Sequence, residues 1–192
     1  KVPECVIANG EPILYPNGVR EKVDYEAELA VVIGRGGRGI TRAQAYDHVF
    51  GYMIVNDVTA RDLQATHKQW PIGKSLDSFC PMGPWLVTAD AVNAEDLSVR
   101  CWVNGELRQD GVAGDMIFDI AAQIEHLTKA FPLEPGDLLF TGTPAGVGAA
   151  YDPPKFVKVG EKARVEVGRL GPIETLAAAH EHGLLQRQIH GN

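Results

Sequence analysis

The sequence has few cysteines and no long apolar run, and each of these scarcities excludes a class of protein. Its three cysteines, at positions 5, 80 and 101, are odd in number and show no C-x-x-C spacing. They therefore predict neither a disulfide framework nor a zinc site. No apolar stretch reaches the ~18 residues of a membrane-spanning helix, and no signal peptide is visible, so we expect a reduced, cytoplasmic protein.

Basic residues are also scarce, because 18 Lys and Arg stand against 25 Asp and Glu and give a net charge of −7. With no basic cluster either, we expect neither nucleic acid nor an anionic membrane as a partner. The 192 residues, 45% of them hydrophobic, are enough for one domain with a sizeable core. The chain opens on Lys1-Val2-Pro3 without a methionine, so we expect a further segment to precede it.

The stretch from Asp24 to Gly34, DYEAELAVVIG, predicts a β-strand, because it holds aromatic, β-branched and small apolar residues with no breaker before the glycine. Side chains on a strand alternate between faces, so Glu26 and Glu28 are expected on the same face. Two adjacent carboxylates repel each other and resist burial. A hard divalent cation would compensate them. The alternative is a strand whose polar face is exposed to water.

The glycine run that follows, GRGGRG over residues 34–39, matches G-x-G-x-x-G. We disfavour a dinucleotide-binding unit for three reasons. The first strand of such a unit is buried on both faces, whereas this one carries two glutamates. The expected helix cap, Thr41, comes after the third glycine, and no repeated βαβ units follow. We interpret the run as a mobile turn with two solvent-exposed arginines.

Local sequence signals predict the secondary structure of the middle of the chain. Residues 51–56 form a strand that ends at Asp57, and Asn104-Gly105 is a strong β-hairpin signal. Residues 67–84 carry no clear periodicity and are expected to be a long irregular loop, a kind of segment that is often functional.

The last third contains one long helix and a glycine-rich loop. An apolar stripe predicts a helix over 116–131 with Asp115 as its cap. The loop 142–148, GTPAGVG, offers backbone N–H groups and the Thr143 hydroxyl, which suit a carboxylate ligand. It lacks the Lys-Ser/Thr pair of a phosphate-binding P-loop. The tail from Thr175 is expected to be helical to about His182.

Several motifs occur in one order along the chain, and together they resemble the fumarylacetoacetate hydrolase family over roughly residues 1–170. Any one of them is weak, but the ordered set is specific. They are the E-x-E strand, Asn56–Gln64 (NDVTARDLQ), Gly73–Asp77 (GKSLD), Gly83–Trp85 (GPW) and Thr141–Gly148 (TGTPAGVG).

The resemblance implies the fold and the metal site. The expected fold is α+β, a β-rich mixed-sheet roll or sandwich of the kind formed by the C-terminal domain of that family. We predict one catalytic domain over residues 1–192, with the tail from about residue 175 outside the resemblance, and a homodimer. The family's metal ligands fall on Glu26, Glu28 and Asp57, which would bind one Mg²⁺, Mn²⁺ or Ca²⁺.

The resemblance also implies a substrate class, small 2-oxo or 2,4-dioxo acids. It places Arg61 and Gln64 beside the substrate and Thr143 on the substrate carboxylate. It places Lys74 where an ammonium group polarises a carbonyl or stabilises an enolate.

One departure from the family pattern concerns the general base. Hydrolytic members activate water with a His–Glu pair upstream of the E-x-E strand, but no histidine precedes Glu26 here. We predict metal-dependent hydrolysis of a C–C bond in an acylpyruvate-like 2,4-dioxo acid, with the base in a segment before Lys1. The alternatives are an isomerase or decarboxylase of a 2-oxo acid, and a non-catalytic homologue that binds a metal and a carboxylate.

Overall fold

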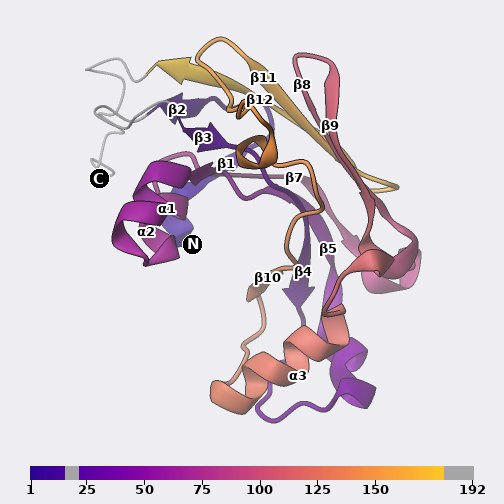
Figure 1. Ribbon diagram of the computed structural model, residues 1–192. Helices are drawn as coiled ribbons and strands as arrows, with labels where there is room; N and C mark the ends of the chain where they lie inside the picture. The colour runs from indigo at the N-terminus through magenta and orange to yellow at the C-terminus, as the bar shows by residue number, and fades with distance from the viewer. Residues whose placement is uncertain (16–21, 180–192) are drawn as a thin grey trace, which may run out of the picture.

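Two five-stranded mixed sheets and three α-helices make up the computed structural model, which describes residues 1–15 and 22–179 (Figure 1). The first sheet has the order β1 (Val6–Ala8), β7 (Cys80–Thr88), β5 (Val49–Asn56), β4 (Ala27–Ile33), β10 (Leu138–Phe140). The second has the order β2 (Ile13–Tyr15), β12 (Gly171–Ala179), β11 (Lys162–Val167), β8 (Ser98–Val103), β9 (Glu106–Val112). This architecture confirms the predicted α+β class.

The smaller elements connect and flank these sheets. A two-stranded ribbon pairs β3 (Val23–Asp24) with β6 (Thr59–Ala60), and it leads directly into the first of the helices. The ribbon and the α-helices are β3 (Val23–Asp24), β6 (Thr59–Ala60), α1 (Arg61–His67), α2 (Trp70–Lys74) and α3 (Ile120–Ala130). Short 3₁₀ segments cover Pro3–Cys5, Arg42–His48, Ala89–Ala91, Ala94–Asp96, Ala113–Asp115 and Gly148–Ala150.

The main core lies between the two sheets. Leu29 and Ile54 from the first sheet share one apolar cluster with Cys101 and Val165 from the second. The opposite face of the first sheet carries a smaller apolar cluster that includes Ala30. Every residue of β4 is therefore buried, on both faces.

The strand expected over residues 24–34 is interrupted. It divides into β3 and β4, with Tyr25 and Glu26 between them in a segment that belongs to neither. We expected this strand, because of its two glutamates, not to be buried on both faces like the first strand of a dinucleotide-binding unit. That expectation is wrong, because Glu28 is buried with the rest of β4. The glycine run lies outside the helices and strands: it bends, Gly37 forms an isolated antiparallel bridge with Leu133, and Arg35 and Arg38 are exposed as expected.

The hairpin prediction at Asn104-Gly105 is confirmed. The two residues join β8 to β9 with φ angles of 49° and 82°. A two-residue hairpin turn with positive φ at both central positions is the one that matches the right-handed twist of the flanking strands. The local sequence alone was sufficient because the turn depends on no distant residue.

The start of the long helix differs from the prediction over 116–131. Asp119 caps α3, and its Oδ1 accepts a hydrogen bond from the Ala122 backbone N–H at 2.8 Å. Asp115 belongs to a preceding 3₁₀ segment instead. Ile117, counted in the predicted apolar stripe, is 93% exposed, so burial begins one turn later than the pattern indicated.

Two further predictions are wrong. Residues 67–84 are not an irregular loop, because they contain α2 and the start of β7. Residues 175–179 are not helical, because β12 continues to Ala179 between β11 and β2; the rest of the predicted tail helix lies outside the described residues. None of the described helices is both long and apolar enough to cross a membrane.

Candidate metal and substrate site

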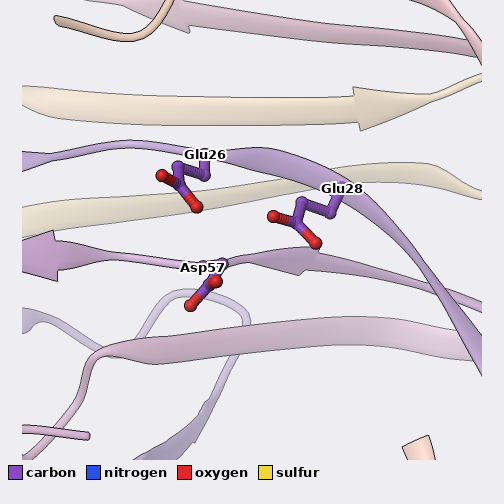
Figure 2. Close-up of side chains that lie close together, drawn as sticks. All are labelled: Glu26, Glu28 and Asp57. Carbon is purple, nitrogen blue, oxygen red and sulfur yellow. The ribbon is translucent and has the colours of Figure 1, made fainter. Parts of the chain in front are cut away.

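Three carboxylates meet where β4 begins and β5 ends. The pairing of Ala27 with Asn56 sets Glu26 beside Asp57, and the Asp57 N–H donates to the Glu26 carbonyl at 2.8 Å. Each of Glu26, Glu28 and Asp57 offers a carboxylate oxygen, and these oxygens lie within 4.8 Å of one another. Figure 2 shows the three side chains converging from β4 and from the end of β5.

All three carboxylates are buried, with exposed fractions of 7% for Glu26, 3% for Glu28 and 7% for Asp57. Burial, together with the negative charges of Asp57 and Glu26, raises the pKa of Glu28 to about 8. The Gly142 backbone N–H, which donates to Glu28 Oε2 at 3.0 Å, opposes this shift. The ionised form of Glu28 is therefore disfavoured in this cluster, and a bound cation would stabilise it.

Two cations from the helical segment contact the cluster. Lys74, at the end of α2, pairs with Glu26 Oε2 at 2.7 Å and also with Asp57. Arg61, at the start of α1, pairs with Glu26 Oε1 at 2.7 Å. Burial lowers the pKa of Lys74, but the charges of Asp57 and Glu26 outweigh it and leave the pKa above its usual value. The ammonium is therefore protonated at neutral pH.

The cluster opens into one cavity of about 960 Å³. Gln64 joins it from α1, where its Oε1 accepts a hydrogen bond from Arg61 at 3.2 Å. Thr143 joins it from the glycine-rich loop. The structure thus brings every residue of the predicted site to the same cavity, namely Glu26, Glu28, Asp57, Arg61, Gln64, Lys74 and Thr143.

Comparison with known proteins identifies the family. Residues 1–176 match the family model described as the C-terminal part of fumarylacetoacetate (FAA) hydrolase. The chain belongs to the fumarylacetoacetate hydrolase family.

Relatives in this family differ in the reaction they are named for. The oxaloacetate tautomerase YisK of Bacillus subtilis is 52% identical over 174 residues, which are 90% of this chain and 58% of that protein. A fumarylacetoacetate hydrolase structure from Exiguobacterium antarcticum superposes with a TM-score of 0.91 at 43% identity, over 94% of this chain and 65% of that one. A 5-carboxymethyl-2-hydroxymuconate delta-isomerase structure from Mycobacterium smegmatis gives 0.85 at 34% identity, over 93% and 67%. The chain spans about 58% of the length of the tautomerase.

Lys1 is a member of the site that the sequence did not indicate. Its side chain is 5% exposed, and its Nζ lies 2.8 Å from Asp57 Oδ1. The same Nζ donates to the carbonyls of Val58 at 3.0 Å and Phe79 at 2.7 Å, and to that of Lys74. A single ammonium therefore joins the end of β5 to α2 and the start of β7. Only the three-dimensional fold brings these carbonyls together.

Asp24 was missed for the same reason. It is fully buried, and it accepts hydrogen bonds from the backbone N–H groups of Gly148 at 2.7 Å and Ala149 at 2.9 Å. Its Oδ2 also accepts from Arg61 Nε at 2.9 Å. Asp24 thus fixes the guanidinium that contacts Glu26 to the end of the glycine-rich loop.

The Thr143 hydroxyl is already engaged within the protein. It donates to the Ala27 carbonyl at 2.9 Å and accepts from Gln109 Nε2 at 2.7 Å. Gln109, which is 1% exposed, also accepts from the Ala27 N–H at 3.0 Å. These bonds hold the loop against the strand that carries Glu28. The predicted contact of this hydroxyl with a substrate carboxylate would have to replace one of them.

No described histidine side chain reaches the cavity. The ring of His48 contacts Arg35, with His48 Nδ1 2.7 Å from the Arg35 carbonyl oxygen. His126 is exposed on α3. Neither His48 nor His126 lines the cavity, so neither of these two described imidazoles is placed to serve as a general base there.

The residues present fit a divalent metal ion. Three buried carboxylates supply hard oxygen donors, which Mg²⁺, Mn²⁺ and Ca²⁺ prefer. Asp57 Oδ1 is buried and accepts no hydrogen bond from a described residue, although Lys1 Nζ lies 2.8 Å away. A cation would use this oxygen and offset the burial and the repulsion that together raise the pKa of Glu28.

Proposed function

We propose that this chain is a divalent-metal-dependent enzyme that acts on a 2-oxo acid by stabilising its enolate. The observation that supports this most directly is the convergence of Glu26, Glu28 and Asp57 with the ammonium of Lys74 at one cavity. Three buried acidic ligands and one protonated lysine are the components that such chemistry requires.

The residues at the cavity would have different roles in this reaction. Glu26, Glu28 and Asp57 would hold the ion, which when bound supplies Lewis-acid polarisation of the 2-oxo oxygen. Lys74 places a fixed positive charge beside them, where it stabilises the negative charge that develops on that oxygen. Arg61 is held in place by Asp24 at 2.9 Å, so it orients the substrate without having to reorganise.

The reaction best supported is tautomerisation or isomerisation. It requires stabilisation of an enolate and a proton transfer, whereas C–C hydrolysis also requires an activated water molecule. The groups at the cavity supply the first of these requirements, with three carboxylates and the Lys74 ammonium at one place. The 52% identity to a protein named as an oxaloacetate tautomerase supports the same choice.

Hydrolysis of a 2,4-dioxo acid, which the family resemblance favoured, is the second candidate. It is supported by the family model and by the 43% identical fumarylacetoacetate hydrolase structure. The homodimer, the cytoplasmic location and the identity of the ion stay predictions.

The decisive experiment measures turnover of oxaloacetate and acetylpyruvate by the 192-residue chain after chelation and after addition of Mg²⁺ or Mn²⁺. Enol–keto conversion is followed by ultraviolet absorbance, and pyruvate and acetate are quantified separately. We expect conversion that chelation abolishes and metal restores. Metal ions alone and the Glu28→Gln variant serve as controls for catalysis by free ions.

Two other results would change the assignment. Acetate and pyruvate released from acetylpyruvate in a metal-dependent way would establish the second candidate. No change in any 2-oxo acid by the metal-loaded chain would overturn the enzyme and leave a binding homologue.

A further inference from the structure

The cavity extends beyond the carboxylates, and much of its remaining wall is apolar. Its volume of about 960 Å³ is at the upper end of the range for small-molecule sites, and far exceeds what a three-carbon 2-oxo acid head occupies. Outside the charged cluster, the lining includes Val6 from β1, Trp70 from α2, and Leu138 and Phe140 from β10. A substrate bound at the carboxylates therefore has apolar walls within reach of its other end.

Strand register explains why the apolar side chains of β10 face the site. Phe140 pairs with Ala30, two residues beyond Glu28 on β4, and so shares its face of the sheet. Val55, opposite Glu28, belongs with Ala30 and Cys80 to the cluster that forms this face, and Phe140 packs against it. Within the described strands, Glu28 is the one charged side chain on this face of the first sheet.

Trp70 stands on the same helix face as Lys74. The two are the first and last residues of α2, and residues four apart on a helix are neighbours on its surface. Lys74 reaches the carboxylates, whereas the Trp70 ring lines the cavity and stays 64% exposed. Its indole N–H donates no hydrogen bond to a described residue. A large flat ring left exposed beside a polar site provides apolar contact area and a free donor.

Charge decides what kind of group this region accepts. Each cation that lines the cavity already pairs with a carboxylate, Lys1 with Asp57, and Lys74 and Arg61 with Glu26. An acidic residue, Asp137, precedes Leu138 of the apolar wall in the chain and also lines the cavity. A second carboxylate on the substrate would meet apolar side chains and a negative charge, and it would lose its hydration without compensation.

We propose that the apolar wall formed by Val6, Trp70, Leu138 and Phe140 is a subsite for the distal end of the substrate, and that Trp70 determines specificity there. The group it takes is an uncharged alkyl, acyl or aryl chain. This inference rests on the proposed function, because it assumes that a 2-oxo acid head occupies the carboxylate cluster. It makes monocarboxylates with an apolar tail better substrates than dicarboxylates of equal length.

The test measures binding, so it does not depend on which reaction occurs. Oxamate is a stable mimic of the 2-oxo acid head, and its amide nitrogen carries a variable tail. Calorimetry with the Mg²⁺-loaded chain compares oxamate, N-butyloxamate and N-(3-carboxypropyl)oxamate, the last two being matched in chain length. We expect butyl to tighten binding at least about tenfold over oxamate, since part of each methylene becomes buried. We expect the terminal carboxylate to remove that gain.

Variants connect the gain to the indole. Trp70→Ala should lose most of the advantage of butyl while oxamate itself binds within about twofold of the unmodified chain. Trp70→Phe should keep much of it, which guards against a loss caused by misfolding. Trp85→Ala is the matched control, because Trp85 is 56% exposed on β7 and does not line the cavity. It should change neither affinity.

Failures of the two proposals are distinguishable. No binding of oxamate to the metal-loaded chain would overturn the proposed function, and the distal subsite with it. Binding of oxamate with no gain from butyl, equal affinity for the carboxypropyl compound, or an undiminished gain in Trp70→Ala would overturn the subsite alone.

Discussion

Glu28 differs from the other two carboxylates of the cluster in having no ion-pair partner among the described residues. Glu26 pairs with Arg61 and Lys74, and Asp57 pairs with Lys1 and Lys74. Glu28 accepts only the Gly142 N–H at 3.0 Å. Replacing Glu26 would therefore release two cations at once, whereas replacing Glu28 would remove one proposed metal ligand and little else.

We therefore expect Glu28→Gln to lower Mg²⁺ affinity at least about tenfold and to abolish activity. The metal-free variant should melt at a higher temperature than the metal-free parent, because a buried carboxyl with a pKa raised to about 8 is replaced by a neutral isostere. Calorimetric titration with Mg²⁺ and thermal melts with chelator measure both effects. Unchanged Mg²⁺ affinity would show that the cluster is not the metal site.

Lys74 allows a separate test, because it contacts the carboxylates without being a metal ligand. We expect Lys74→Met to lower kcat by about a hundredfold or more, the scale of losing one preorganised charge at a transition state. Mg²⁺ affinity should hold or rise, since the ammonium competes for Glu26 and Asp57. Lys129→Met is the control, because Lys129 lies on α3 with its side chain 65% exposed. Wild-type kcat in Lys74→Met would remove the lysine from the reaction.

At the scale of single elements, capping of α3 makes a testable distinction between two neighbouring aspartates. Asp119→Ala should cost about 1 kcal/mol of unfolding free energy, because the Ala122 N–H loses its acceptor at 2.8 Å. Asp115→Ala should cost much less, because Asp115 lies in a separate 3₁₀ segment. Urea unfolding of both variants measures the difference. An equal cost for both would mean that the helix begins earlier in solution.

The same helix shows what a sequence can and cannot predict about elements. The spacing of Ile120, Ala121 and Ile124 was sufficient to predict that a helix exists, because its period is a property of consecutive residues. Its start was not predicted, since Asp115 and Asp119 are equally good caps by type. The end of β12 failed for a related reason: Thr175 pairs with Ala163 on β11, and strand pairing outweighs local helical preference.

The residues of the candidate site also fall into those that the sequence predicted and those that it did not. The ordered motifs were sufficient to predict that all seven residues lie at one cavity, because the family resemblance assigned each of them to a single site. Lys1 and Asp24 carry no motif, and they act through contacts with residues far away in the chain. Lys1 bonds to carbonyls 57 and 78 positions away, and Asp24 bonds to backbone N–H groups 124 and 125 positions away. Only the folded chain reveals such residues.

At the scale of the whole molecule, the accessibility of the three cysteines can show whether the two sheets unfold together. Cys5 and Cys80 belong to the small cluster beside the cavity, and Cys101 lies in the main core between the sheets. All three are buried as free thiols. Burial raises the pKa of Cys80 to about 12 and also raises the pKa values of Cys5 and Cys101. Since the thiolate is the reactive form, none of them should react at neutral or mildly alkaline pH in the native state.

We expect the native chain at pH 8 to resist a thiol-alkylating reagent and to gain three labels together when it unfolds. The physical reason is that the main core joins residues of both sheets, including Leu29 and Val165, so neither sheet should open alone. Mass spectrometry of samples taken through a urea series resolves zero, one, two and three labels. A doubly labelled population, modified at Cys5 and Cys80 with Cys101 protected, would contradict this. It would show that the sheet carrying the candidate metal site opens before the core does, and that ligand binding and global stability are separable properties of the fold.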